Sequence, residues 1–129
     1  SNGDGHGLKR MTFDDDEAGS PVYSVPRDIT IRAVVIRTNG VVLSGTTAQV
    51  VRIFANGNAG TGTLLDVSYN ASQFTRHNSE NSNATHHSLV TTGLSTSYNA
   101  GDTLAVRRNS GAVDMGDYIV DVWFSIDNA

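Results

Sequence analysis

Three histidines and a glutamate in the second half of the chain, His77, Glu80, His86 and His87, are of the types that bind metal ions. Imidazole nitrogens and carboxylates are common zinc ligands. Neighbouring residues on a strand point to opposite faces, so His86 and His87 would not hold one ion together. The spacing also matches no recognised ligand signature. We interpret these side chains as solvated, and the sequence predicts no metal and no other cofactor.

A second candidate is the acidic run Asp14, Asp15, Asp16 and Glu17. Calcium loops alternate their carboxylates with other residues, and this run does not. Runs of like charge are usually solvated or make electrostatic contacts with a partner. The run therefore indicates a contact segment.

Sequence motifs for nucleophilic chemistry are absent. The chain has no cysteine and no Gly-x-Ser-x-Gly turn, and its glycine-rich stretch near residue 60 lacks the lysine of a phosphate-binding loop. We predict that the protein is not an enzyme.

The length and net charge of the chain limit the number of domains and the classes of partner that it can bind. The chain has 129 residues and a formal net charge of −4, which suits one domain and argues against nucleic-acid or anionic-membrane partners. No apolar run approaches the roughly 20 residues that cross a bilayer. The sequence thus predicts neither a nucleic-acid nor a membrane partner.

The elements that carry these residues have the two-residue period of strands. In residues 117–126, Val120, Val122, Phe124 and Ile126 share one face. Seven or eight such segments are separated by glycine- and asparagine-rich turns. This pattern predicts an all-β fold: an antiparallel jelly-roll sandwich of about eight strands over residues 21–129. The polar residues 75–85 are expected to form an exposed loop.

Residues 1–20 differ in composition and predict an extended N-terminal arm, ordered only when a partner holds it. The side chains of the arm that are expected to contact the partner fall into three groups, which are apolar, basic and acidic. They are Leu8, Met11 and Phe13; Lys9 and Arg10; and Asp14, Asp15, Asp16 and Glu17.

Two features indicate association between subunits. Trp123 lies on the polar face of its strand, where a large aromatic side chain is usually covered by another surface. Residues 31–36 are apolar on both faces of their strand. One interpretation places Val34, Ile36 and Trp123 in a subunit interface. The other covers this strand with a loop or with the arm.

Two parts of the chain resemble a known family. The segment Ala100-Gly101-Asp102-Thr103-Leu104-Ala105-Val106, followed by the closing aromatic strand 117–126, resembles small jelly-roll virion proteins of tailed bacteriophages. The opening Val25-Pro26-Arg27-Asp28-Ile29-Thr30-Ile31 is similar to the start of such domains. The similarity covers about residues 22–127, and its Ala-Gly-Asp strand entry also occurs in tumour-necrosis-factor-like and C1q-like jelly rolls.

The resemblance implies a structural protein of the virion. It would be a homotrimeric decoration, or cement, protein that binds the major capsid protein on the outside of a phage head, with residues 1–20 reaching onto the capsid.

Two alternatives remain open. A tail-fibre or carbohydrate-binding host-recognition module would use Tyr69, Tyr98, Trp123 and residues 75–85 to bind sugars. A C1q-like signalling ligand is disfavoured because the first residues have no apolar signal-peptide core.

Overall fold

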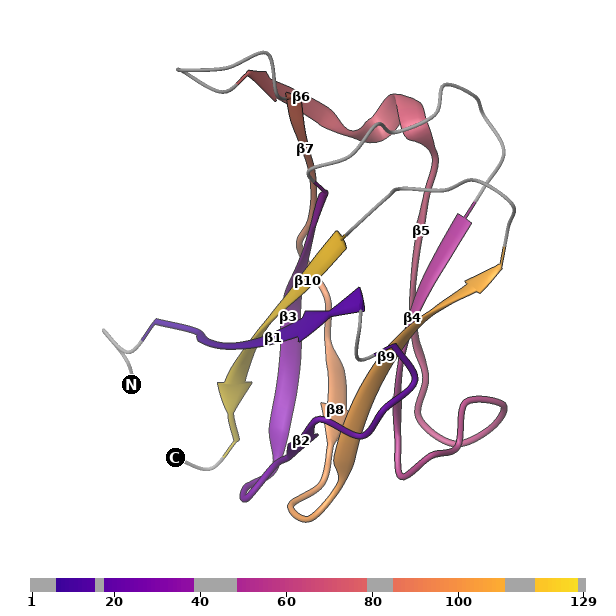
Figure 1. The fold of residues 1–129 in the computed structure, drawn as a ribbon. Coiled ribbons are helices and arrows are strands. Elements are labelled where there is room, and N and C mark those ends of the chain that lie inside the picture. Colours follow the sequence, from indigo (N-terminus) through magenta and orange to yellow (C-terminus); the bar gives the residue numbers. More distant parts are fainter. Residues whose placement is uncertain (1–6, 16–17, 39–48, 79–84, 111–117, 128–129) are drawn as a thin grey trace.

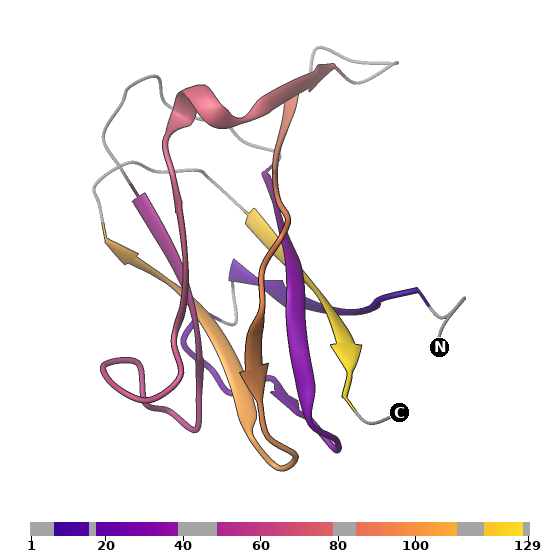
Figure 2. The ribbon, with the colours of Figure 1, turned by 180° about the vertical axis from the view of Figure 1, so that it is seen from behind.

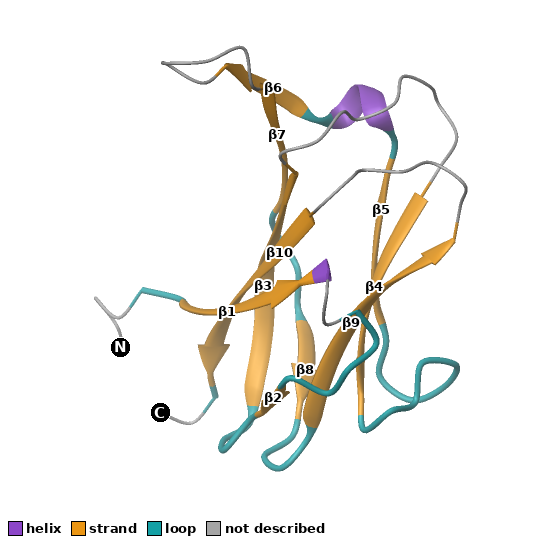
Figure 3. Cartoon of the chain, viewed as in Figure 1, coloured by secondary structure: helices purple, strands orange, loops and turns teal. Residues whose placement is uncertain are grey.

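The computed structural model describes residues 7–15, 18–38, 49–78, 85–110 and 118–127. Two antiparallel sheets face each other as the two layers of a β-sandwich (Figure 1; Figure 3). The predicted all-β sandwich is confirmed. Within the described residues, no helix is long and apolar enough to span a bilayer.

Sheet A has six strands in the spatial order β1-β10-β3-β7-β6, with β8 also paired to β3. Its strands are β1 (Lys9–Asp14), β3 (Ile29–Thr38), β6 (Thr75–Asn78), β7 (Thr85–Thr91), β8 (Thr96–Tyr98) and β10 (Tyr118–Ile126).

Sheet B has four strands in the order β2-β9-β4-β5. Its strands are β2 (Tyr23–Ser24), β4 (Gln49–Ala55), β5 (Leu65–Tyr69) and β9 (Thr103–Ser110). A short 3₁₀ turn, η2 (Ala71–Gln73), connects β5 to β6. The two sheets bury one apolar core, whose most central side chains are Ile29, Ile31, Val34, Ile36, Val51, Ile53, Leu104, Val120 and Val122.

The central strand β3 contains a β-bulge at Arg32. Trp123 pairs with Ala33, and the next residue, Phe124, pairs with Ile31, so Arg32 has no opposite residue on β10. A bulge adds one residue and therefore reverses which face the following side chains occupy. Ile29 and Ile31 face the core before the bulge, and Val34 and Ile36 face it afterwards.

The other neighbour of β3 changes at the same place. β8 pairs with residues 29–31 of β3, and β7 pairs with residues 34–38. Figure 2 shows β7 and β8 following one another along β3. The loop between them is fixed by a hydrogen bond from the Leu94 amide to the Arg32 carbonyl oxygen (3.1 Å). Both sides of β3 thus accommodate the extra residue.

The bulge explains why residues 31–36 look apolar on both faces. Val34 and Ile36 are 0% exposed and belong to the core. The prediction that these two side chains form a subunit interface is therefore wrong, because a second subunit cannot reach them in the folded chain.

The predicted arm is also corrected. Residues 9–14 form β1, which pairs along its length with β10. Met11 and Phe13 are only 4% and 2% exposed and pack in the core, so they cannot dock on a partner. Leu8, Lys9, Arg10 and Asp14 are exposed and Asp15 is partly exposed. Asp16 and Glu17 lie outside the described residues.

The predicted polar loop over residues 75–85 is wrong at its ends. Residues 75–78 form β6, an edge strand that pairs with β7, and Thr85 begins β7. Edge strands tolerate polar side chains because one edge, and here one face, meets solvent. Residues 79–84 lie outside the described part of the chain.

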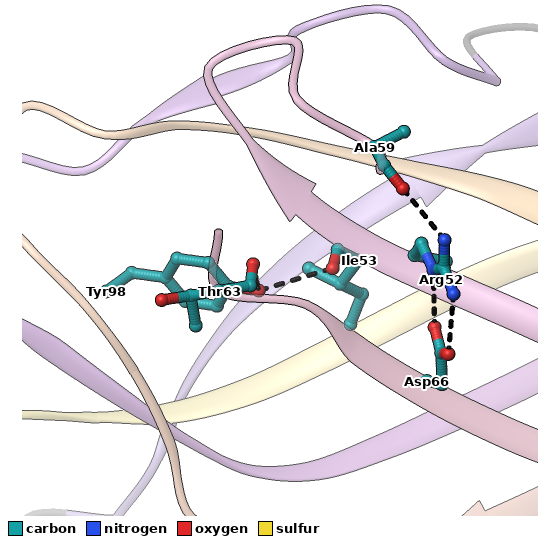
Figure 4. Close-up of polar contacts among 6 residues, drawn as sticks. All are labelled: Arg52, Ile53, Ala59, Thr63, Asp66 and Tyr98. Atoms are coloured by element: carbon teal, nitrogen blue, oxygen red, sulfur yellow. Dashed lines mark hydrogen bonds and ion pairs between the residues drawn. The ribbon is translucent and has the colours of Figure 1, made fainter. Parts of the chain in front are cut away.

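Tyr98 joins the two sheets through a buried hydroxyl group. It belongs to β8 of sheet A, and its Oη lies 3.2 Å from the carbonyl oxygen of Ile53 on β4 and 3.1 Å from that of Thr63 (Figure 4). The hydroxyl donates its proton to these oxygens across the sandwich. Burial raises the pKa of Tyr98, so the donor remains protonated at neutral pH.

Tyr69 is buried without such a bond. Its ring packs edge-to-face on Phe74 at 5.4 Å, while its hydroxyl has no hydrogen-bond partner among the described residues. Burial raises its pKa from 10.0 to about 12. The folded chain therefore holds this proton more tightly than the unfolded chain, and stability falls as pH rises between these two values.

We predict that Tyr98→Phe lowers the free energy of unfolding by about 1–2 kcal/mol, because it removes the hydroxyl donor from the buried carbonyl oxygen of Ile53 and from that of Thr63. Tyr69→Phe removes a hydroxyl that has no such partner, so we expect it to be neutral or stabilising by up to about 1 kcal/mol. Urea unfolding of both variants measures the difference. Equal losses in the two variants would contradict the assignment.

We predict that deletion of Arg32 prevents folding, whereas Arg32→Ala costs less than about 1 kcal/mol. Without the extra residue, Ile29 and Ile31 would turn to the outside, a loss of roughly 3–6 kcal/mol of burial. Circular dichroism and thermal unfolding of both variants check this. A cooperatively folded deletion variant would show that the bulge is dispensable.

Candidate functional site: the outer face of sheet A

The candidate site is the face of sheet A that points away from sheet B. Since side chains alternate along a strand, the neighbours of buried Met11, Phe13, Val34, Ile36, Val120 and Val122 occupy this face. They are Arg10, Thr12 and Asp14 on β1; Ile119, Asp121 and Trp123 on β10; Ala33, Val35 and Arg37 on β3; and Ser88 and Val90 on β7.

The middle of this face is apolar. Val35 lies opposite Val90, and Ala33 lies opposite Trp123. Val90 is 61% exposed, and the other three side chains are partly exposed. We call these four residues the apolar patch. Sequence reasoning identified Trp123 but missed Val35 and Val90, because only the bulge turns Val35 outward.

Trp123 is covered in part by its own chain. Arg10 lies opposite it on β1, with the guanidinium carbon 5.5 Å from the ring centroid. A cation over an indole face is attracted by the electrons of the ring. The contact gives this tryptophan a partner within the chain. Whether a second subunit also covers it stays a prediction.

Asp121 fixes the charged border of the apolar patch. It is nearly buried, and its two carboxylate oxygens accept hydrogen bonds from Thr12 Oγ1 and Arg37 Nε, both at 2.8 Å. A buried carboxylate requires such partners. One carboxylate thus joins three strands, β1, β10 and β3, directly beneath the exposed face.

The outer face of sheet B is more polar. Arg52 and Asp66 form a two-pronged ion pair on β4 and β5, with Nε–Oδ1 at 2.7 Å and Nη2–Oδ2 at 2.8 Å (Figure 4). The hydrogen bond from Arg52 lowers the pKa of Asp66. Arg107 lies over the ring of Phe54 at 5.8 Å. The apolar patch therefore distinguishes sheet A from sheet B.

An open groove of about 950 Å³ adjoins the apolar patch where β6 and β7 extend past β10. Its lining mixes charged, polar and aromatic side chains. They are Asp14, Asp15, Val35, Arg37, Thr38, His77, His86, His87, Ser88, Tyr118 and Ile119.

Among the described residues that line the groove are a serine and a histidine, the side-chain types that serve as nucleophile and general base in some enzymes. His77 Nε2 lies 2.9 Å from Ser88 Oγ, on neighbouring strands. A catalytic pair needs a third group that orients the histidine, and the contacts of His77 within the described residues include no carboxylate. Burial raises the pKa of Tyr118, so its hydroxyl is protonated at neutral pH and is not a base. The geometry favours a structural hydrogen bond.

The histidines do not assemble a metal site in the described part of the chain. His77 and His86 lie opposite each other on β6 and β7, but no group of three or more possible ligands gathers there. Glu80, the predicted carboxylate of this set, lies outside the described residues.

The sugar-binding alternative loses two of its aromatic side chains. Tyr69 and Tyr98 are 3% and 1% exposed, so neither ring can stack on a sugar. Of the three aromatic residues assigned to that site, only Trp123 reaches the surface.

No protein-family model matches this chain, and no curated protein or solved structure is significantly similar to it. The interpretation of the site therefore depends on its own geometry.

We predict that Arg10→Ala lowers the free energy of unfolding by about 0.5–1 kcal/mol through loss of the contact with Trp123. The variant should also expose the indole, the only one in the chain, to quenchers. Acrylamide quenching of tryptophan fluorescence measures this. Arg76→Ala, on the opposite edge of sheet A, is the control, and quenching that is the same in both variants would contradict the contact.

Proposed function

We propose that this protein is a non-enzymatic structural protein of a virion, a decoration protein that binds the major capsid protein on the outside of a phage head. The observation that carries the proposal is the outer face of sheet A, which has an apolar centre and a charged border. Stable protein interfaces commonly have this arrangement.

The order of the strands supports the jelly-roll assignment on which the resemblance depends. If β7 and β8, which pair with successive parts of β3, are counted as one interrupted strand and the short edge strand β6 is left out, sheet A has the order 1-8-3-6 and sheet B the order 2-7-4-5. Two interleaved four-stranded sheets of this kind are typical of jelly rolls. In this numbering β1 is the first strand of sheet A.

The mode of docking differs from the arm mechanism expected from composition. Because Met11 and Phe13 are in the core, attachment by these two side chains is replaced by attachment through the apolar patch. Val90 is its most exposed member, and Arg10, Arg37 and Asp121 border it. Binding of many copies to an assembled shell, and not to free capsid subunits, would stabilise that shell by mass action.

The homotrimer implied by the resemblance stays a prediction. Of the three side chains assigned to its interface, only Trp123 reaches the surface. The carbohydrate-binding alternative is not proposed, since no observation favours it.

We predict that Val90→Glu weakens binding to capsids by about tenfold or more, because it places a charge in the centre of the proposed interface. The fold should be retained, since this side chain is largely exposed. The measurement is cosedimentation of the protein with purified heads, with the copy number per capsid subunit determined by mass spectrometry.

Ser68→Glu is the matched control, because it adds the same charge to the outer face of sheet B. It should bind heads like the unmodified chain. Failure of the unmodified protein to cosediment with any head, or equal binding by both variants, would reject the proposal.

A further inference from the structure

The free edge of sheet A carries an unusual charge order. β1 is the outermost strand in the spatial order of the sheet, and its described pairing is with β10 alone (Figure 1). Its first two residues, Lys9 and Arg10, are basic, and Asp14 at its end and Asp15 after it are acidic. An edge strand offers unpaired backbone groups, to which another strand can add.

This charge order is complementary to itself when the strand is turned around. If two β1 strands run antiparallel with Thr12 opposite Thr12 of the second copy, each Arg10 lies opposite an Asp14. Asp15 lies beyond the end of β1, where its carbonyl oxygen accepts a hydrogen bond from the Ala18 amide, so the strand register does not extend to it. A two-fold axis through Thr12 therefore creates two pairs of opposite charge.

The register also satisfies the alternation of the strand. Arg10, Thr12 and Asp14 point to the outer face, while Met11 and Phe13 point to the core. Opposite residues in this register always share a face, so the outer faces of the two sheets would be continuous. The backbone N–H and C=O groups of β1 that point toward the free edge would likewise meet the edge-facing groups of the second β1.

The charge order does not resemble that of a protected edge. Edges are commonly protected by lysines and other charges, and charges of one sign repel a second copy. β1 carries both signs, separated into its two halves. Arg10 is also held in place by Trp123, which reduces the ordering cost of a new ion pair. Asp14 already has contacts within its own chain, so the new pairs add to existing interactions.

We propose that two copies of this chain associate through β1, antiparallel and centred on Thr12, to form one continuous sheet across a two-fold axis. The partner is a second copy of the chain. The proposal does not depend on the virion role, because it is argued from the free backbone edge and the charge order of β1. A two-fold dimer is an alternative to the homotrimer that the resemblance implies. Arg10 also borders the apolar patch, so dimer formation and capsid binding are measured separately.

The experiment exchanges the charges of the central pair. In Arg10→Glu, each Glu faces Asp14 of the partner copy, and in Asp14→Lys each Lys faces Arg10. We expect roughly tenfold or greater weakening of the dimer in each single variant, because two attractive pairs become repulsive. The double variant Arg10→Glu/Asp14→Lys restores opposite charges and should dimerise again. Analytical ultracentrifugation over a range of concentrations, at low and high salt, measures this.

Mixing the two single variants gives the sharpest test. Each alone carries like charges across the axis, but in a mixed dimer Glu faces Lys and Asp14 faces Arg10. An equimolar mixture should form heterodimers, which native mass spectrometry separates by mass. Arg76→Glu, on the opposite edge strand β6, is the control and should dimerise like the unmodified chain.

Hydrogen exchange provides a second readout that does not depend on substitution. The amides of β1 should become more protected as the concentration of the unmodified chain rises, while those of edge strand β5 should not. A monomer at all concentrations, a trimer, or a dimer that the single variants leave intact would overturn the proposal. So would failure of the mixed variants to associate when the single variants have lost their dimers.

Discussion

The extra residue in β3 decides which side chains enter the core and which reach the surface. β3 pairs with β10, β7 and β8. A reversal, within β3, of the face on which its side chains lie therefore affects most of sheet A. Before Arg32, odd-numbered residues face the core, and after it even-numbered residues do. The same change turns Val35 outward beside Val90. The apolar core and the apolar patch therefore have one geometrical origin.

The charged groups of sheet A depend on this arrangement as well. Asp121 lies opposite Val35 on β3, and it receives hydrogen bonds from Thr12 on one side and from Arg37 on the other. Because its carboxylate is nearly buried, loss of Arg37 would leave the charge without its cation, and loss of Thr12 would leave one carboxylate oxygen without its donor. The border of the apolar patch is thus rigid, which lowers the ordering cost of binding at this face.

The all-β class and most strands follow from sequence because alternation and turn residues are local signals. The bulge does not, since its two-against-one pairing depends on the partner strand. Simple alternation along residues 29–36 therefore places Val34 and Ile36 on the wrong face. The glycine-rich and charged composition of residues 1–20 predicts an unstructured arm, although Met11 and Phe13 have the two-residue spacing of the strand β1. For Trp123 the missing information was its neighbour, because Arg10 meets it only when residues over a hundred positions apart become paired.

That pairing of β1 with β10 has a consequence for biosynthesis. Thr12 and its partner Asp121 are separated by 109 positions, so the ribosome makes nearly the whole described chain before this contact is possible. Closing so long a loop is entropically costly and slow compared with forming a local hairpin. Until β10 emerges from the exit tunnel, Met11 and Phe13 have no strand beside them and remain open to chaperones. Sheet A is therefore completed only after β10 has been made.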